Sequence, residues 1–464
     1  MAENNINPTT ANAGQSAAAA PLHAELNDRV VKRKSIVDFS EDIWAVVIGG
    51  IIIIAVLGIS LFSPGLKFSV PVYSWASSAD LFQKVLTLNN LLLVAVIGAI
   101  FLAISSIAIT LSGGTTRNYV QGFVLIFILA IISLIIAGNK TINYYGIEYV
   151  VFALVAGLLI GNLTTLPTWL AEAARSEFFI KTGLVILGSS ILFTDIIKAG
   201  IPGILQSVIV VAVVWFFSMW LSRLLKVDDE FGVILASAVS ICGVSAAIVA
   251  AGAIKGDKKK LSYVTTLVLV VAIPMLIILP WVIRKLGIPE IVGGAWLGGT
   301  LDTTASVTAA SQLVGPLALK AGVIVKFSQN VLIGVAAIFI AAWWTLKKNP
   351  SATSATEGQG LGIIWERFPK FVLGFIAASL LFSFLIPTGT TKQVAGILNS
   401  LRTVWFALAF VAIGLEARFS DLVKIQGGRP AVAFIGAQIF NIAWTLLWAY
   451  LLFGGVLFPS PDLK

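Results

Sequence analysis

The chain has 464 residues, of which 58% are hydrophobic and 11% are charged, with a formal net charge of +9. Soluble domains are about 45–50% apolar and about 25% charged, so this composition excludes a water-soluble globular protein. Cys242 is the only cysteine and His23 the only histidine, which excludes a disulfide scaffold and histidine-based metal sites or triads. Lysine and arginine gather in the cytoplasmic loops of membrane proteins, so the positive charge does not indicate nucleic-acid binding.

Residues 1–40 are polar and predict a disordered tail, which the basic cluster Lys32–Lys34 before the first apolar run places in the cytoplasm. Thirteen apolar segments follow, within residues 41–346 and 367–457. Their apolar runs are continuous, which favours membrane helices over the alternating strands of a barrel. The polar stretch 347–366 predicts a cytoplasmic linker. We therefore expect an all-α, polytopic helical membrane protein.

The loop Lys255–Lys260 tests how many segments span the membrane. If all thirteen crossed from a cytoplasmic N-terminus, this most basic short loop would face outward, against the positive-inside rule. The conflict disappears if segments 231–254 and 290–313 each enter and leave on one side. Both are also polar and rich in glycine. We expect eleven spanning helices plus these two broken or re-entrant helices; the alternative is that they cross as broken helices and another segment fails to span.

A weak internal repeat relates Gly188–Lys198 to Gly414–Lys424, at an offset of 226 residues. Glycine, Phe, Ser/Thr, Asp and Lys recur in register, and apolar segments lie before and after each copy. Many secondary transporters are built from repeated halves. Chance similarity between two helix ends is the alternative.

The first broken segment combines small residues with hydroxyls. Glycine lets a membrane helix unwind, and hydroxyls satisfy the backbone groups that are freed. A helix that restarts after the glycine would direct its N–H groups at a bound anion. We therefore expect Ser240, Cys242, Gly243 and Ser245 to bind substrate. Close packing of small residues between helices is the alternative.

The second broken segment is the most polar stretch within any apolar run. A carboxylate at membrane depth is costly and by default indicates an ion path or a ligand site. We expect Asp302 to bind a coupling cation, Na⁺ or H⁺, or to pair with Lys326; a helix cap near the water interface is the alternative. The substrate ligands expected here are Gly299, Thr300, Thr303, Thr304 and Ser306.

Two further polar groups are candidates. Lys326, Gln329 and Asn330 lie within the apolar run 318–346, where we expect them to bind the anion. Snorkelling of the lysine to the interface is the alternative. Glu416 ends another apolar run, and either couples protons or forms a helix-end ion pair with Arg418.

Enzyme and ATP-binding motifs are missing from the sequence. No phosphate-binding loop, nucleophile elbow or zinc motif occurs. We therefore expect neither an enzyme nor a primary pump, and no cofactor or resident metal beyond a coupling ion.

Five blocks of the chain resemble, in order, the bacterial YeiH family, to which sulfate export is ascribed. They are Cys242–Ala246, Gly294–Ala310, Val325–Ser328, Phe368–Phe375 and Gly414–Glu416. The resemblance implies an inner-membrane transporter that exports a small oxyanion. Family members carry a histidine near the position of Asp302 and an arginine near that of Gln329. Their replacement here disfavours a doubly charged anion and favours a cation-coupled or less charged substrate.

The function expected from these observations is secondary transport. The chain would export sulfate, sulfite or a sulfonate by alternating access, with the substrate between the two broken helices. A Na⁺- or H⁺-coupled symporter of a small organic solute is the first alternative, and a passive anion channel the second. The expected partners are the bilayer of the bacterial inner membrane and a small anion, without nucleic acid; a homodimer is compatible with the sequence but not required.

Overall fold

The computed structural model describes residues 39–62, 69–144, 148–254, 256–348, 369–417 and 428–463. All of them belong to one compact unit. Their regular structure is helical, apart from an isolated bridge between Trp75 and Asn139. Nearly all of the predicted tail and linker, 1–38 and 349–366, lies outside the described residues.

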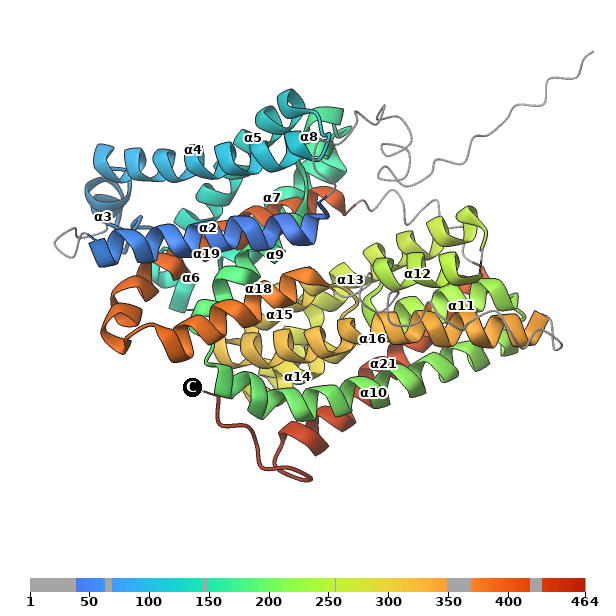
Figure 1. The fold of residues 1–464 in the computed structure, drawn as a ribbon. Helices are drawn as coiled ribbons and strands as arrows, with labels where there is room; N and C mark the ends of the chain where they lie inside the picture. The colour runs from blue at the N-terminus through green and yellow to red at the C-terminus, as the bar shows by residue number, and fades with distance from the viewer. Residues whose placement is uncertain are drawn as a thin grey trace, which may run out of the picture. The chain divides into compact units, whose positions relative to one another are not determined.

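Eight of the described helices are long and apolar enough to cross a bilayer. They are α2 (Glu41–Phe62), α4 (Leu88–Leu111), α5 (Thr116–Ala137), α10 (Phe193–Leu224), α13 (Lys258–Leu286), α16 (Pro316–Lys348), α19 (Thr388–Glu416) and α21 (Arg429–Phe453) (Figure 1). This confirms the all-α, polytopic membrane fold. The total of eleven spans stays a prediction.

Shorter helices complete the described chain. Those before α10 are α3 (Ser78–Asp80), η1 (Leu81–Val85), α6 (Lys140–Tyr144), α7 (Tyr149–Leu163), α8 (Thr168–Ala173), α9 (Ser176–Leu187) and η2 (Gly188–Ser190). Those after it are α11 (Asp229–Ser237), η3 (Ala238–Cys242), α12 (Val244–Ile254), α14 (Glu290–Thr300), α15 (Thr304–Val314), α18 (Lys370–Leu380) and η4 (Leu381–Leu385).

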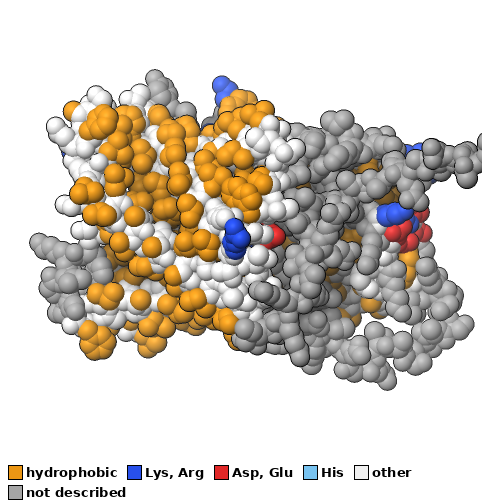
Figure 2. All heavy atoms as spheres, turned by 90° about the horizontal axis from the view of Figure 1, so that it is seen from above, with side chains coloured by type: hydrophobic (Ala, Val, Ile, Leu, Met, Phe, Trp, Pro, Cys, Tyr) orange, Lys and Arg blue, Asp and Glu red, His pale blue; other side chains and the backbone are white. Residues whose placement is uncertain are grey.

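The described surface is largely apolar. Figure 2 shows hydrophobic side chains over most of the described surface on the face in view, with few charged groups among them. Ile54 on α2, Leu92 on α4 and Ile201 on α10 expose 68%, 54% and 64% of their area. Monomeric soluble proteins rarely expose contiguous apolar area on this scale, whereas lipid accommodates it.

The first broken segment folds back to the end at which it starts. Asp228 caps α11 by accepting the Phe231 N–H, and the chain runs through η3 to Gly243 before α12 returns. At the open end, Lys260 Nζ of α13 donates to Asp228 Oδ1 at 2.7 Å and to Glu230 Oε2 at 3.1 Å. We call residues 229–254 hairpin 1.

The second broken segment also folds back. Glu290 Oε1, at the start of α14, accepts the backbone N–H groups of Leu317 and Ala318 at the start of α16. Near the end of α15, the Leu313 carbonyl accepts a hydrogen bond from Arg284, near the end of α13. We call residues 290–314 hairpin 2. The two hairpins open at opposite ends of α13. Both predicted segments are broken in the structure, and each folds back toward its own start; that they re-enter the membrane rather than cross it stays a prediction.

Long helices run beside both hairpins. α16 packs against α14 and α15 of hairpin 2 and against α12 and η3 of hairpin 1, and α10 packs against α11 and α14 (Figure 1). The helices flanking the sequence repeat also pack in pairs, α9 with α19 and α10 with α21. The first repeat copy covers η2 and the start of α10, whereas residues 418–424 of the second lie outside the described residues.

Candidate functional site

The tips of the two hairpins touch. A Cβ added to Gly243 would lie 3.0 Å from the Asp302 Cβ and 2.7 Å from Cγ1 of Val268 on α13. Gly243 turns hairpin 1 with φ 64° and ψ −117°, a conformation that residues with a side chain rarely adopt. In hairpin 2, Leu301 and Thr303 are extended and separate α14 from α15. The tips therefore bring two breaks, distant in sequence, to one place.

Lys326 ties both tips to α16. Its side chain is fully buried, and its Nζ donates to the Ile241 carbonyl of hairpin 1, the Leu301 carbonyl of hairpin 2 and Gln329 Oε1, each at 2.8 Å. An ammonium group has three N–H donors, and all three are used. In this conformation Lys326 therefore has no donor left for the anion that the sequence assigned to it.

Buried amides cap the other carbonyls that the breaks set free. Gln329 Nε2 donates to the Ser240 carbonyl at 2.9 Å and to the Gly299 carbonyl at 3.2 Å. Asn441 Nδ2 of α21 donates to the Val239 and Thr300 carbonyls at 3.2 and 3.3 Å. A helix end leaves carbonyls without intrahelical partners, and lipid supplies no water to replace them. These amides let broken helices persist inside an apolar protein.

Asp302 lies at the centre of this arrangement. Its side chain is 2% exposed, and neither carboxylate oxygen has a hydrogen-bond partner among the described residues. The charge of Lys326 acts on it, and the Gln438 side chain lies beside it. Buried polar atoms without partners are rare and call for an explanation such as a bound ion or water.

Hydroxyl groups organise the start of α15 and the accessible side of the tips. Thr303 accepts the Ser306 N–H at 3.0 Å and donates to Ser306 Oγ at 2.8 Å. Asn330 Nδ2 donates to Thr304 Oγ1 at 3.1 Å. Ser245 is exposed and Thr303 is half-buried, so the first turns of α12 and α15 are open on one side.

The structure gathers nearly all of the expected site residues around the tips. On hairpin 1 and hairpin 2 these are Ser240, Cys242, Gly243, Ser245, Gly299, Thr300, Asp302, Thr303, Thr304 and Ser306, and on α16 they are Lys326, Gln329 and Asn330. Sequence reasoning missed Gln206, Gln438, Asn441 and Thr445, which are buried around the same tips. The one sequence signal that could have revealed each of these residues is its position as a single polar residue inside an apolar run.

Glu416 lies elsewhere. Its Oε1 accepts the Ser176 N–H at 3.0 Å and its Oε2 accepts the Ser176 hydroxyl at 2.6 Å, so it caps the start of α9. The alternative partner, Arg418, lies outside the described residues. The proton-coupling role assigned to Glu416 stays a prediction.

Comparison with known proteins identifies the family. Residues 121–433 match the family described as conserved hypothetical protein 698. The chain belongs to this family, the UPF0324 membrane proteins. This confirms the resemblance to the YeiH family that the sequence blocks carry. No solved structure matches the chain.

Relatives come from several bacteria. A UPF0324 membrane protein of Rhodopirellula baltica is 38% identical over 365 residues, covering 76% of this chain and 66% of the relative. One from Nitratidesulfovibrio vulgaris is 36% identical over 369 residues, covering 76% and 62%. One from Nitrosomonas europaea is 32% identical over 343 residues, covering 66% and 69%. The chain spans slightly less than two thirds of the first two relatives.

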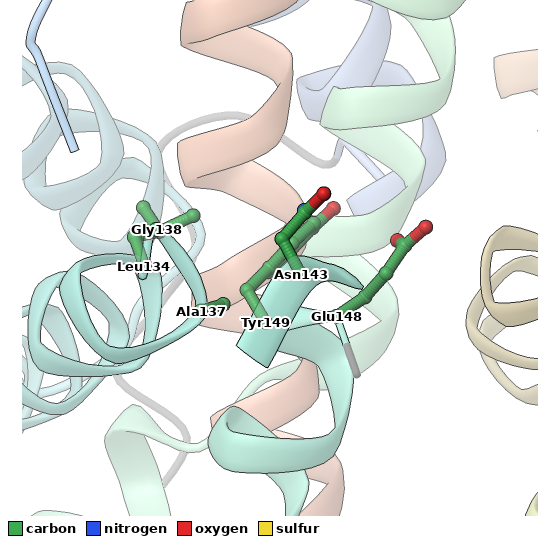
Figure 3. Close-up of a pocket in the computed structure, with 6 residues that line it drawn as sticks. All are labelled: Leu134, Ala137, Gly138, Asn143, Glu148 and Tyr149. Atoms are coloured by element: carbon green, nitrogen blue, oxygen red, sulfur yellow. The ribbon is translucent and has the colours of Figure 1, made fainter. Parts of the chain in front are cut away.

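A pocket lies between the end of α5, α6 and the start of α7 in this UPF0324 protein. It has a volume of about 180 Å³, and Figure 3 shows its polar lining residues, Asn143, Glu148 and Tyr149, beside the end of α5. Gln312 Nε2 of α15 donates to Glu148 Oε2 at 3.3 Å. Burial raises the pKa of Glu148, against the opposing effects of the Gln312 hydrogen bond and the Arg284 charge.

We expect Glu148→Gln to raise the melting temperature at pH 8 and to leave it nearly unchanged at pH 4. A carboxyl whose folded-state pKa is raised favours folding below its unfolded pKa, and that contribution is lost as pH rises through the folded pKa. The glutamine keeps the shape without the buried charge. Thermal unfolding in detergent at both pH values measures the difference.

Asp80→Asn is a control of opposite sign. The hydrogen bond from Lys84 lowers the pKa of Asp80, so this change should lower the melting temperature slightly at pH 8. A Glu148→Gln shift that is equal at the two pH values contradicts the assignment of a desolvated carboxylate.

Proposed function

We propose that the chain is a secondary transporter that carries a small anion across the bacterial inner membrane by alternating access. The observation that supports this most strongly is the meeting of two hairpins, which open at opposite ends of α13 and touch at Gly243 and Asp302. Discontinuous helices that meet inside a membrane bundle are a common way to build a transport site.

The anion would bind at the first turns of α12 and α15. Both are helices of 11 residues whose N-terminal ends lie at the tips, and helix N-termini attract anions through their free N–H groups. Ser245 and Thr303 add hydroxyls on the open side. The opposite charges of Lys326 and Asp302 leave the tips without net charge, which favours sulfite or a sulfonate over fully ionised sulfate.

The orientation follows from charge. Lys260 and its neighbours Lys258 and Lys259 lie at the open end of hairpin 1, and the positive-inside rule places that end and the N-terminus in the cytoplasm. Hairpin 2 would then open to the outside. We propose export as the direction, coupled to Na⁺ or H⁺ through Asp302, and no nucleic acid or enzymatic step is involved.

A second candidate is cation-coupled symport of a small organic solute. The unpartnered Asp302 carboxylate supports it, because a cation site is expected whichever solute moves. A channel is less favoured, because Lys326 and the amides close the space between the tips with hydrogen bonds.

Flux into proteoliposomes tests the proposal. We expect saturable uptake of labelled sulfite, methanesulfonate or sulfate, and counterflow when the same anion is loaded inside. Thr303→Val should reduce uptake, whereas Thr303→Ser, which keeps the hydroxyl cap, should retain it. Flux that rises linearly with concentration would indicate the channel. No flux above protein-free liposomes for any of these anions would sink the anion transporter.

A further inference from the structure

Four buried side-chain oxygen atoms at or beside the tip of hairpin 2 have no hydrogen-bond partner among the described residues. They are Asp302 Oδ1 and Oδ2, Thr300 Oγ1 and Gln438 Oε1. The Gln438 amide joins the group, because its Nε2 donates to the Thr300 carbonyl at 3.1 Å and its side chain also lies against Asp302. Such a cluster within the folded chain is the kind of exception that a ligand explains.

The nearby hydrogen-bond donors already have other acceptors. Gln438 Nε2 bonds the Thr300 carbonyl and Met275 Sδ, and Asn441 Nδ2 bonds the Val239 and Thr300 carbonyls. The three N–H groups of Lys326 bond two carbonyls and Gln329. What remains is a set of oxygen acceptors at the C-terminal end of α14, where the helix dipole is negative. Oxygen atoms are the ligands that hard cations prefer.

We propose that a Na⁺ ion binds between Asp302, Thr300 and Gln438, on the α21 side of the hairpin 2 tip. This deepens the proposed function by naming the coupling ion of the Asp302 site, and rests on that function only for the ion's role in transport. Lys326 already offsets the charge of Asp302, so a monovalent ion adds one positive charge to the site, whereas a divalent ion would add two. A divalent ion would lack charged ligands here, because the described residues contain no group of three or more acidic, histidine or cysteine side chains.

A proton fits this oxygen set less well. Protonation of Asp302 supplies one donor for several unpartnered oxygens, whereas a Na⁺ ion accepts several oxygen ligands. Half-helix C-termini and unwound backbone in transporters coordinate cations in this way. Asp302 directly precedes Thr303, the cap of α15, so a bound ion would also fix the N–H groups that face the anion. Na⁺ binding should therefore tighten anion binding.

The test is thermal unfolding of the purified full chain in NaCl, KCl and choline chloride at equal ionic strength, at pH 6 and pH 8. We expect a saturable Na⁺-specific rise in melting temperature at both pH values. Asp302→Asn should abolish it. Gln438→Met and Thr300→Val, which remove one oxygen ligand each at nearly constant size, should raise the half-saturating Na⁺ concentration tenfold or more, whereas Thr300→Ser keeps the hydroxyl and the response.

Gln312→Met is the matched control. Gln312 is a glutamine of α15, but its Nε2 donates to Glu148 Oε2 at 3.3 Å, at the start of α7 and not at the tips. We expect a lower baseline melting temperature and an unchanged Na⁺ response. Because a variant that fails to fold gives no melting curve, binding of ²²Na⁺ to the wild type, competed by unlabelled Na⁺, is measured alongside.

Three results overturn the inference: equal effects of Na⁺ and choline, a Na⁺ response that survives in Asp302→Asn, or stabilisation by low pH alone that disappears in Asp302→Asn. The last result would assign a proton to Asp302. Failure of the proposed function is distinguishable. If Na⁺ binds but no anion is transported, the Na⁺ site is supported and the proposed transport function is wrong. If anion flux is saturable but does not depend on Na⁺, the transport function is supported and the Na⁺ site is wrong.

Discussion

Replacing Lys326 with methionine should lower the free energy of unfolding by about 3–5 kcal/mol and abolish transport. Methionine keeps the length of the side chain but removes the ammonium. The Ile241 and Leu301 carbonyls and Gln329 Oε1 would each lose a 2.8 Å hydrogen bond. The buried Asp302 carboxylate would lose the compensating charge beside it. Each loss is costly at a site from which water is excluded.

A double-mutant cycle separates these two causes. If the uncompensated charge of Asp302 dominates, adding Asp302→Asn to Lys326→Met should recover more than 1 kcal/mol of the lost stability. If the loss of hydrogen bonds to the carbonyls dominates, the stability changes caused by the two substitutions should add. Lys326→Arg keeps the charge, but the planar guanidinium group does not match three acceptors placed around one nitrogen. We therefore expect it to retain only part of the wild-type stability.

Chemical unfolding in detergent and anion flux in proteoliposomes measure both effects. Lys84→Met serves as the control, because Lys84 exposes 60% of its side chain and its ion pair is with Asp80, one turn earlier. It should change stability by less than about 1 kcal/mol. A Lys326→Met protein with the stability and flux of the wild type would show that the tips do not depend on this lysine.

The hairpins could be predicted from the sequence because two independent features coincide in them. The charge of Lys255–Lys260 required two segments to return to their own side, and glycine with hydroxyls singled out which two. Gly243 as the turn follows from local chemistry, because glycine adopts positive φ. The sequence offered Asp302 as a helix cap, and the cap of α15 is its neighbour Thr303. Local rules therefore placed both breaks.

The partners of the tips could not be predicted, because they depend on contacts between distant segments. Lys326 bonds a carbonyl 85 residues earlier, and its sequence position alone suggested an anion ligand. Gln438 and Asn441 are isolated amides in the apolar helix α21, and their bonds to Thr300 span 138 and 141 residues. Glu416 caps a helix that starts 240 residues earlier, a contact that its sequence position did not indicate.

Gly243→Ala should cost about 2–4 kcal/mol of stability and strongly reduce transport. Gly243 has φ 64° and ψ −117°, where an alanine is strained. The added methyl group would also lie 2.7 Å from Val268 Cγ1 and 3.0 Å from Asp302 Cβ. Relief of this overlap would push the tips apart, away from the carbonyl positions that Lys326 holds together.

Gly252→Ala provides the matched control in the same hairpin, on α12. A Cβ at Gly252 meets nothing within 4 Å, and alanine is favoured over glycine inside a helix by about 1 kcal/mol. We therefore expect unchanged or slightly higher stability and normal flux. The comparison uses the melting temperature and the initial rate of anion uptake. If both variants behave alike, the tip contact does not limit folding or transport, and the close approach of Gly243 to Asp302 carries no functional weight.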